Sequence, residues 1–165
     1  MSAILLKIAV GAVTLAGIGV TWTTFNSTIY PYSISQPSSF RHGVWSQTDD
    51  QKVDYFYPSL GSSVTRVSIM AQRGAHATGE IPYLRDLGGH SIHQSGQLSV
   101  LGQSRRLICA DLPFLGGSFR VEQLTFVAGG YVWRLTASYE MRFRWIRSTM
   151  LHMLHTFKLH DTARH

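Results

Sequence analysis

The sequence predicts an α+β protein in which an antiparallel sheet is covered by helices and is preceded by a single N-terminal transmembrane helix. Three observations support this fold class. The chain begins with a long apolar run, about seven short strand patterns follow with hairpin-length turns, and a longer helical pattern closes the chain. The closing helix is amphipathic, so we expect it to pack on the sheet.

The N-terminal segment is apolar from Ala3 to Trp22, and Lys7 is its only charged residue. About twenty residues rising about 1.5 Å each cover the roughly 30 Å hydrocarbon core of a bilayer. We therefore predict a membrane anchor at residues 1–22, joined to the domain by a linker at residues 23–31. The anchor positions are Ala3, Leu5, Ile8, Val13, Leu15, Ile18, Val20 and Trp22.

A cleaved secretory signal is an alternative interpretation of this segment. Lys7 would then be its basic start, Ile8 to Leu15 its apolar stretch, and Ala16 the end of a small-residue cleavage site. A buried globular helix is a third interpretation, which the absence of a polar face in the run disfavours.

The charges that flank the run predict its orientation. Lys7 and the terminal amine lie on its short side, and no Lys or Arg follows until Arg41. Positive charge is enriched on the cytoplasmic side of membrane proteins, so we expect a cytoplasmic N-terminus and a periplasmic or lumenal C-terminal domain. Membrane lipids are then expected partners, and nucleic acid is not.

Length and composition indicate one domain. The chain has 165 residues, and we assign residues 32–160 to the domain and 161–165 to a tail. The net charge of +6 is scattered along the chain, which is typical of a solvated surface and also suits anionic lipid headgroups. The single cysteine, Cys109, can form no intrachain disulfide, and we expect it in the core.

Local patterns place the elements of the domain. Gly88-Gly89 is expected to end a short helix at 81–87, and Gly129-Gly130 is expected to form a hairpin turn. A helix is predicted from Tyr139 to Leu159, with Ser138 as its N-cap. Its apolar stripe comprises Ile146, Met150, Met153, Leu154 and Phe157. Strands are expected at 32–35, 44–45, 53–57, 64–72, 98–101, 104–111, 118–127 and 131–137.

Three segments together resemble a known family. They are Tyr32-Ser33-Ile34-Ser35-Gln36-Pro37, Tyr83-Leu84-Arg85-Asp86-Leu87-Gly88, and Tyr131-Val132-Trp133-Arg134-Leu135-Thr136-Ala137 with a helix after it that closes in Leu154-His155-Thr156-Phe157-Lys158-Leu159. In this order they resemble the PsbP/Mog1/DcrB-like superfamily, over residues 30–160. The resemblance implies an α/β/α sandwich that acts as a non-catalytic binding or assembly module. Relatives include lumenal accessory proteins of photosystem II and bacterial envelope lipoproteins.

Two departures limit what the resemblance implies. The envelope lipoproteins carry a lipidated cysteine after the signal, whereas the only cysteine here is Cys109. The plant photosystem proteins are soluble in the lumen, whereas this chain has a predicted anchor. No functional residue of the family matches a position of this sequence, so none is transferred.

Catalytic and metal motifs are weak. His90 and His93 lie in a predicted glycine-flanked loop, and His152 and His155 lie one helical turn apart. These are the candidate metal ligands, but a zinc site needs three or four and no third is suggested nearby. No nucleophile elbow, Ser-His-carboxylate spacing or phosphate loop is present in the sequence. We therefore expect no enzymatic activity, no cofactor and no metal.

The leading functional hypothesis is a non-catalytic, membrane-anchored accessory or scaffold subunit of a larger photosynthetic or respiratory membrane complex. Its partners would be other integral membrane subunits. The candidate contact residues are Gly11, Gly17, Phe25, Tyr30, Phe114 and Leu115. The alternatives are a free-standing envelope protein of DcrB-like type that binds a ligand or assists export, and a small hydrolase or metal protein.

Overall fold

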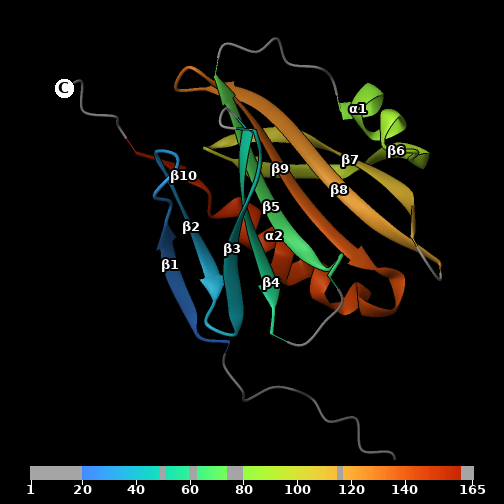
Figure 1. Ribbon diagram of the computed structural model, residues 1–165, viewed down its shortest axis with the longest axis horizontal. Helices are drawn as coiled ribbons and strands as arrows, with labels where there is room; N and C mark the ends of the chain where they lie inside the picture. Colours follow the sequence, from blue (N-terminus) through green and yellow to red (C-terminus); the bar gives the residue numbers. More distant parts are fainter. Residues whose placement is uncertain (1–19, 49–50, 60–62, 74–79, 115–116, 161–165) are drawn as a thin grey trace, which may run out of the picture.

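A large antiparallel sheet forms the centre of the molecule (Figure 1). The computed structural model describes residues 20–48, 51–59, 63–73, 80–114 and 117–160. Within these ranges a seven-stranded sheet has the order β3-β4-β5-β9-β8-β7-β6, and every pairing is antiparallel, as the sequence predicted. Its strands are β3 (Phe40–Thr48), β4 (Gln51–Pro58), β5 (Arg66–Arg73), β6 (His90–Val100), β7 (Gln103–Phe114), β8 (Gly117–Ala128) and β9 (Tyr131–Glu140).

A smaller sheet and three helical segments complete the described fold. The small sheet has the order β1-β2-β10 and consists of β1 (Trp22–Asn26), β2 (Tyr32–Pro37) and β10 (Lys158–Leu159). The helical segments are α1 (Glu80–Asp86), the 3₁₀ turn η1 (Met141–Ile146) and α2 (Arg147–His155). Figure 1 shows α2 on the small-sheet side of the large sheet, and α1 near β6 and β7.

The two faces of the large sheet are covered unequally. Side chains alternate along a strand, so Val67, Leu124 and Leu135 point to one face, which we call the helix face. There they pack with α2 and the small sheet into the main core. The opposite face, which we call the open face, is covered within the described residues only by α1, whose Leu84 packs on Ala110 of β7 and its neighbours. Because α1 has seven residues, it covers only part of this face.

Three buried aromatic rings join the two sheets at the centre of the main core. Trp133 of β9, Tyr32 of β2 and Phe157 after α2 are each exposed by 1% or less. The Trp133 and Phe157 ring centroids are 5.0 Å apart, and Tyr32 stacks on Phe157 at 5.2 Å. Trp133 Nε1 also donates to the carbonyl of Ala128 at 2.9 Å, so its one polar atom is satisfied. Burial of these rings is a large part of the apolar stabilisation.

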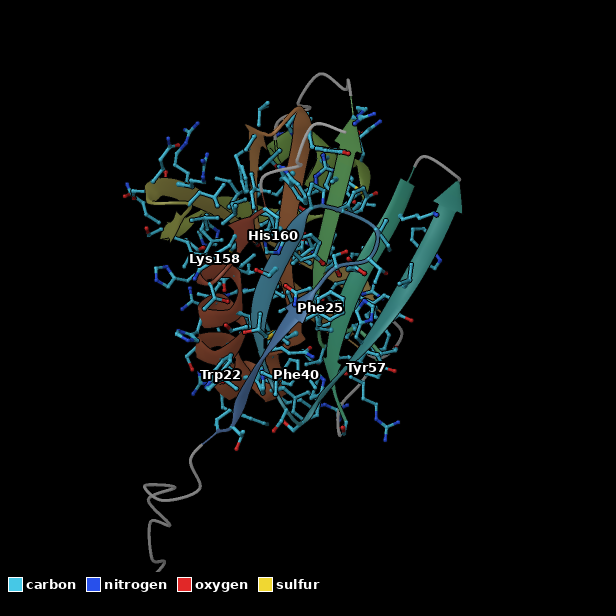
Figure 2. All side chains as sticks on the ribbon, turned by 90° about the vertical axis from the view of Figure 1, so that its left-hand side faces the viewer. Trp22, Phe25, Phe40, Tyr57, Lys158 and His160 are labelled. Atoms are coloured by element: carbon cyan, nitrogen blue, oxygen red, sulfur yellow. The ribbon has the colours of Figure 1, made fainter. Side chains whose placement is uncertain are left out.

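The carboxylate of Asp54 forms a second, polar link between the sheets. Asp54 lies on β4 at the helix face and is fully buried. Its Oδ2 accepts hydrogen bonds from the hydroxyls of Ser27 and Tyr32, both at 2.6 Å, and its Oδ1 lies 2.7 Å from Nε2 of His42. Burial, together with the nearby Asp54 charge, raises the pKa of Tyr32, so its hydroxyl remains a donor. Figure 2 shows β1 crossing this region, from Trp22 to Phe25.

Two glycine pairs form turns, as the sequence predicted. Gly129 and Gly130 have φ values of 58° and 77°, and they join β8 to β9. Gly88 has a φ of 80° and ends α1, where its amide donates to the carbonyl of Arg85. A Cβ on Gly89 would lie 2.5 Å from the carbonyl oxygen of Leu84, so the close packing of this turn requires glycine there.

The predicted closing helix begins too early in the chain. β9 continues through Tyr139 and Glu140, η1 follows, and α2 begins only at Arg147. Ser138 is therefore not an N-cap: its hydroxyl donates to the carbonyl of Val64 across the sheet at 2.6 Å. The apolar stripe itself is confirmed, because all of its members are buried. They are Ile146, Met150, Met153, Leu154 and Phe157.

The predicted linker is also partly wrong, because β1 occupies residues 22–26 and pairs with β2 over its whole length. Trp22 lies at the start of β1, and its ring packs edge-on against His152 of α2 at 4.7 Å. Val20 is 55% exposed. The other anchor positions, Ala3, Leu5, Ile8, Val13, Leu15 and Ile18, lie outside the described residues. Among the described residues, no helix has the length and apolar character that crossing a bilayer requires.

We predict that Asp54→Asn lowers the free energy of unfolding by roughly 2–4 kcal/mol, because charge-assisted hydrogen bonds between the sheets are lost. The matched control is Asp111→Asn, which removes a carboxylate from a partly exposed pair with Arg120 and should cost about 1 kcal/mol or less. Urea titration of the full chain in mild detergent, followed by tryptophan fluorescence, measures both. Equal losses for the two variants would contradict the assigned role of Asp54.

Candidate functional site

The open face of the large sheet contains a groove. One row of side chains crosses the neighbouring strands β8, β9, β5, β4 and β3 in register: Gln123, Thr136, Ser68, Tyr55 and Gly43. Thr136 and Ser68 are small, so the centre of this row is low. The next row, Arg134, Met70, Val53 and Trp45, is bulkier and forms one wall. The hollow therefore forms because the side chains at the centre of the first row are smaller than those of the row beside it.

A glycine on β3 helps to shape the groove. A Cβ at Gly43 would lie 2.5 Å from the ring of Tyr55, so only the absence of a side chain lets that ring lie across β3. Tyr55 in turn stacks on Tyr57, with ring centroids 5.6 Å apart. The Tyr55 ring is thus held beside the groove rather than over its floor.

The remaining walls come from α1 and from β7 and β8. Tyr83 and Leu84 of α1 and Leu87 of the turn after it line the groove on one side, and Leu112, Phe119 and Val121 line it near the end of the sheet where β8 begins. At the rim, Trp45 is 53% exposed and Leu87 is 51% exposed. These large apolar side chains stand at the mouth of a mainly apolar hollow, which is the usual character of a binding site.

Two polar groups in the groove have unused hydrogen-bonding capacity. Gln123 is 1% exposed; its Oε1 accepts from the Thr136 hydroxyl at 3.3 Å, but its Nε2 has no partner. Nε of Arg134 also has no partner, and its guanidinium lies 3.6 Å from the centroid of the Tyr83 ring. A buried donor without a partner is destabilising, so such a group normally binds water, an ion or a ligand.

The volume of the groove limits its occupant. It is about 240 Å³, somewhat below the roughly 300–1,000 Å³ typical of sites for drug-sized ligands. One or two apolar side chains of a peptide, or a small amphiphile, match this volume. The donors on Gln123 and Arg134 suit a carbonyl, carboxylate or other anionic oxygen on that occupant.

A second hollow, of about 430 Å³, lies on the helix face at the β6 side and has a polar lining. It is bordered by the polar cluster His93, Cys109, Arg120, Glu122, Tyr139 and Arg147. Glu122 is 1% exposed and accepts two hydrogen bonds from Arg147, at 2.6 and 2.8 Å. Burial, with the Glu122 charge as a smaller cause, raises the pKa of Tyr139 to about 12. The charges of the cluster are thus engaged with one another.

Cys109 is buried in this cluster, as the sequence predicted, and its Sγ lies 3.3 Å from Nε2 of His93. Irregular register in β6 on both sides of His93 turns this histidine toward β7. Burial is the main cause that raises the pKa of the thiol. Nucleophilic chemistry and metal binding use the thiolate, whereas this environment favours the protonated thiol.

The structure places the predicted histidine ligands apart. His90 and His93 lie on β6, not in a loop as predicted, because the strand begins at His90. His152 and His155 lie on α2 with ring centroids 6.3 Å apart, but Nδ1 of His155 lies 2.7 Å from the carbonyl oxygen of Ser99 and His152 packs on Trp22. Within the part of the chain that is described, no three His, Cys, Asp or Glu side chains are grouped as metal ligands.

Two of the predicted partner contacts are used inside the fold. The Phe25 ring packs on His42 and Phe56, and the Tyr30 ring packs on Trp133 while its hydroxyl donates to the carbonyl of Lys52 at 3.0 Å. Phe114 is 39% exposed and contacts Phe119 at the groove end of β7. Leu115, Gly11 and Gly17 lie outside the described residues.

Sequence reasoning missed Gln123 and Arg134. A weak signal existed for Gln123, because it shares one side of the strand with Val121 and Val127, where an alternating pattern predicts apolar residues. No comparable signal marked Arg134, since an arginine in an alternating strand normally faces solvent. Its place beside Gln123 follows only from the pairing of β8 with β9.

Comparison with known proteins shows the fold. No protein-family model matches the chain, and no curated protein matches its sequence. The solution structure of cyanobacterial PsbP (CyanoP) from Synechocystis sp. PCC 6803 superposes with a TM-score of 0.56 at 11% identity, over 87% of this chain and 96% of that one. The protein has a PsbP-like fold.

A second similar structure is a longer protein. The crystal structure from Bacteroides thetaiotaomicron VPI-5482 has a TM-score of 0.55 at 12% identity, and it covers 86% of this chain. This chain spans about half of that protein, 49% of its length. At these identities the PsbP-like fold is what the two likenesses establish. The family resemblance seen in the sequence is confirmed at the level of the fold.

We predict that Cys109 does not react with a water-soluble disulfide reagent at neutral pH until the protein is denatured. The thiol is buried and its pKa is raised, so reaction of the folded chain should begin only as the pH rises above the ordinary thiol value near 9.0. Ser118→Cys, at an exposed position on β8, is the reactive control. Rapid labelling of Cys109 in the folded protein would contradict this account.

We also predict that Gln123→Leu leaves stability unchanged or raises it, because the unpartnered amide is replaced by an apolar group of similar size. Leu124→Ala, the neighbouring residue on the helix face, sets the scale and should cost about 2–5 kcal/mol. Thermal unfolding of both variants tests this. A loss for Gln123→Leu close to that of Leu124→Ala would mean that the amide has a structural partner.

Proposed function

We propose that this protein is a non-catalytic binding module that receives a short apolar segment of a partner protein in the open-face groove. The observation that carries the proposal is the buried amide nitrogen of Gln123, Nε2, which lacks a hydrogen-bond partner within the described residues on the floor of an apolar groove. One anchoring side chain of the partner fills the hollow, and an adjacent carbonyl or carboxylate accepts from Gln123 and Arg134. Apolar anchors in small pockets often dominate the affinity of such contacts.

The rim of the groove supports a protein partner. Trp45 and Leu87 are exposed at the mouth, and Phe114 is exposed at the end of β7. A small ligand inside the hollow would leave these side chains in water, whereas a chain segment lying along the groove would cover them. Aromatic side chains at the margin of a pocket are typical of protein interfaces.

We further propose that the module is a membrane-anchored accessory subunit of a larger membrane complex, photosynthetic or respiratory. The apolar character of the N-terminal segment before β1 supports the anchor, and the likeness to cyanobacterial PsbP supports the photosynthetic class. An anchor confines the domain to a plane, which raises its effective concentration beside membrane partners. A small groove with modest intrinsic affinity is then sufficient.

Binding of a small amphiphile is the second candidate, and it corresponds to a free-standing envelope protein. The cationic Arg134 beside an apolar hollow favours it, because an apolar body with an anionic head fits both features. Native mass spectrometry of the purified chain separates the two candidates: a bound small molecule that is lost in Gln123→Leu supports the second.

We predict that a photoreactive phenylalanine analogue at Leu87 crosslinks a discrete partner in native membranes. The same analogue at Val127 should not, because Val127 is 66% exposed on β8 but lies away from the groove. Gln123→Leu and Arg134→Met should each reduce the yield of the Leu87 adduct about fivefold or more, as expected for lost hydrogen bonds to an anionic or carbonyl oxygen.

The matched control for Arg134→Met is Arg73→Met. Arg73 also stacks on a tyrosine ring, that of Tyr131, at 5.4 Å, but it lies outside the groove. The Arg73→Met variant should therefore leave the yield of the Leu87 adduct unchanged. Equal yields at Leu87 and Val127, or equal losses in the two arginine variants, would overturn the proposed groove contact.

A further inference from the structure

The turn η1 presents an amphipathic surface at one end of the molecule. Trp145 is 70% exposed, the largest exposed fraction among the large apolar side chains of the described residues. Arg142 and Arg144 are also exposed, whereas Ile146 is buried and Phe143 packs against the main core. We propose that η1 lies on the surface of a lipid bilayer that carries anionic headgroups.

The burial of residues in η1 shows how one short turn makes both contacts. The turn is kinked at Phe143, whose backbone φ of −105° and ψ of 22° are not helical. Phe143 and Ile146 pack inward and fix the turn to the domain. Arg142, Arg144 and Trp145 are exposed, so the outer surface of the turn carries two cations and an indole ring. An indole with an apolar ring and a polar N–H is typical of the interface between headgroups and hydrocarbon.

The position of η1 in the fold supports lipid as its partner. Val20 and Trp145 line one shallow hollow, together with Phe40 and Pro58, and Val20 belongs to the apolar N-terminal run. Figure 2 shows Trp22 and Phe40 at this same end of the molecule. A chain anchored by that run would therefore hold η1 at the membrane surface. The inference rests on the anchor that is part of the proposed function.

The charges of η1 fit an anionic surface. No acidic residue lies in its first turn, and the acidic residue just before it, Glu140, is mostly buried and pairs with Arg142. Arg144 is exposed and has no ion-pair partner within the described ranges. Arginine near a membrane can extend its guanidinium to the headgroups while its aliphatic part lies on apolar surface.

The test places an environment-sensitive fluorophore on the full chain through Trp145→Cys, with Trp45→Cys as the matched control. Both tryptophans are more than half exposed, at 70% and 53%, but Trp45 lies at the groove. Cys109→Ser removes the native thiol from both variants. The probes are vesicles of phosphatidylcholine alone and of phosphatidylcholine mixed with phosphatidylglycerol.

We expect the emission at position 145 to shift to shorter wavelength and to be protected from iodide, more strongly in the mixed vesicles, while position 45 stays aqueous in both. Arg142→Gln with Arg144→Gln should abolish the difference between the two lipid compositions. Co-flotation of the chain with vesicles is measured in parallel, because it reports on the anchor separately.

The outcomes separate the inference from the anchor. If the chain floats with both kinds of vesicle but positions 145 and 45 are equally aqueous, η1 does not contact lipid and only this inference fails. If the chain floats only with the mixed vesicles, and Trp145→Cys and the arginine variants reduce its flotation, η1 binds anionic lipid and the anchor fails. If the chain floats with neither, both are wrong.

Discussion

The fold depends on how the small sheet is fixed to the large one, and the buried carboxylate of Asp54 provides the polar part of that attachment. It brings together Ser27 of the loop between β1 and β2, Tyr32 of β2, and His42 of β3. Ser27 also accepts from the backbone amides of Ile29 and Tyr30, so the same hydroxyl orders the loop. A buried charge is tolerated because each oxygen has a polar partner, and this requirement defines where the small sheet lies.

The attachment has a consequence for the other side of the large sheet. The small sheet and α2 cover the helix face, where large apolar side chains such as Trp133 of β9 are buried, whereas among the described residues α1 alone packs on the open face. The rows that contain Ser68 and Thr136 are then left as a hollow. The incomplete face is thus the natural place for recognition.

Local sequence signals predicted the parts of the fold that local chemistry determines. Gly129-Gly130 and Gly88-Gly89 form the predicted turns because positive φ values need glycine. The end of β9 was mispredicted because Tyr139 and Glu140 are kept extended by contacts from elsewhere: Tyr139 hydrogen-bonds to Glu122, and Glu140 pairs with Phe119 in register. The groove could not be predicted for the same reason, since its floor joins five strands whose register no single segment encodes.

The groove and η1 are related through the direction of the strands. β9 ends at Glu140 immediately before η1, and its antiparallel neighbour β8 begins at that same end, so β9 runs toward η1 and β8 runs away from it. With η1 on a bilayer, the sheet rises from the lipid surface, and the open face points sideways rather than toward the membrane or away from it. Arg66, Phe119 and Ser138, near that end of the strands, line the groove. A segment emerging from a neighbouring membrane protein would therefore meet the groove close to the lipid surface, where a short reach is enough.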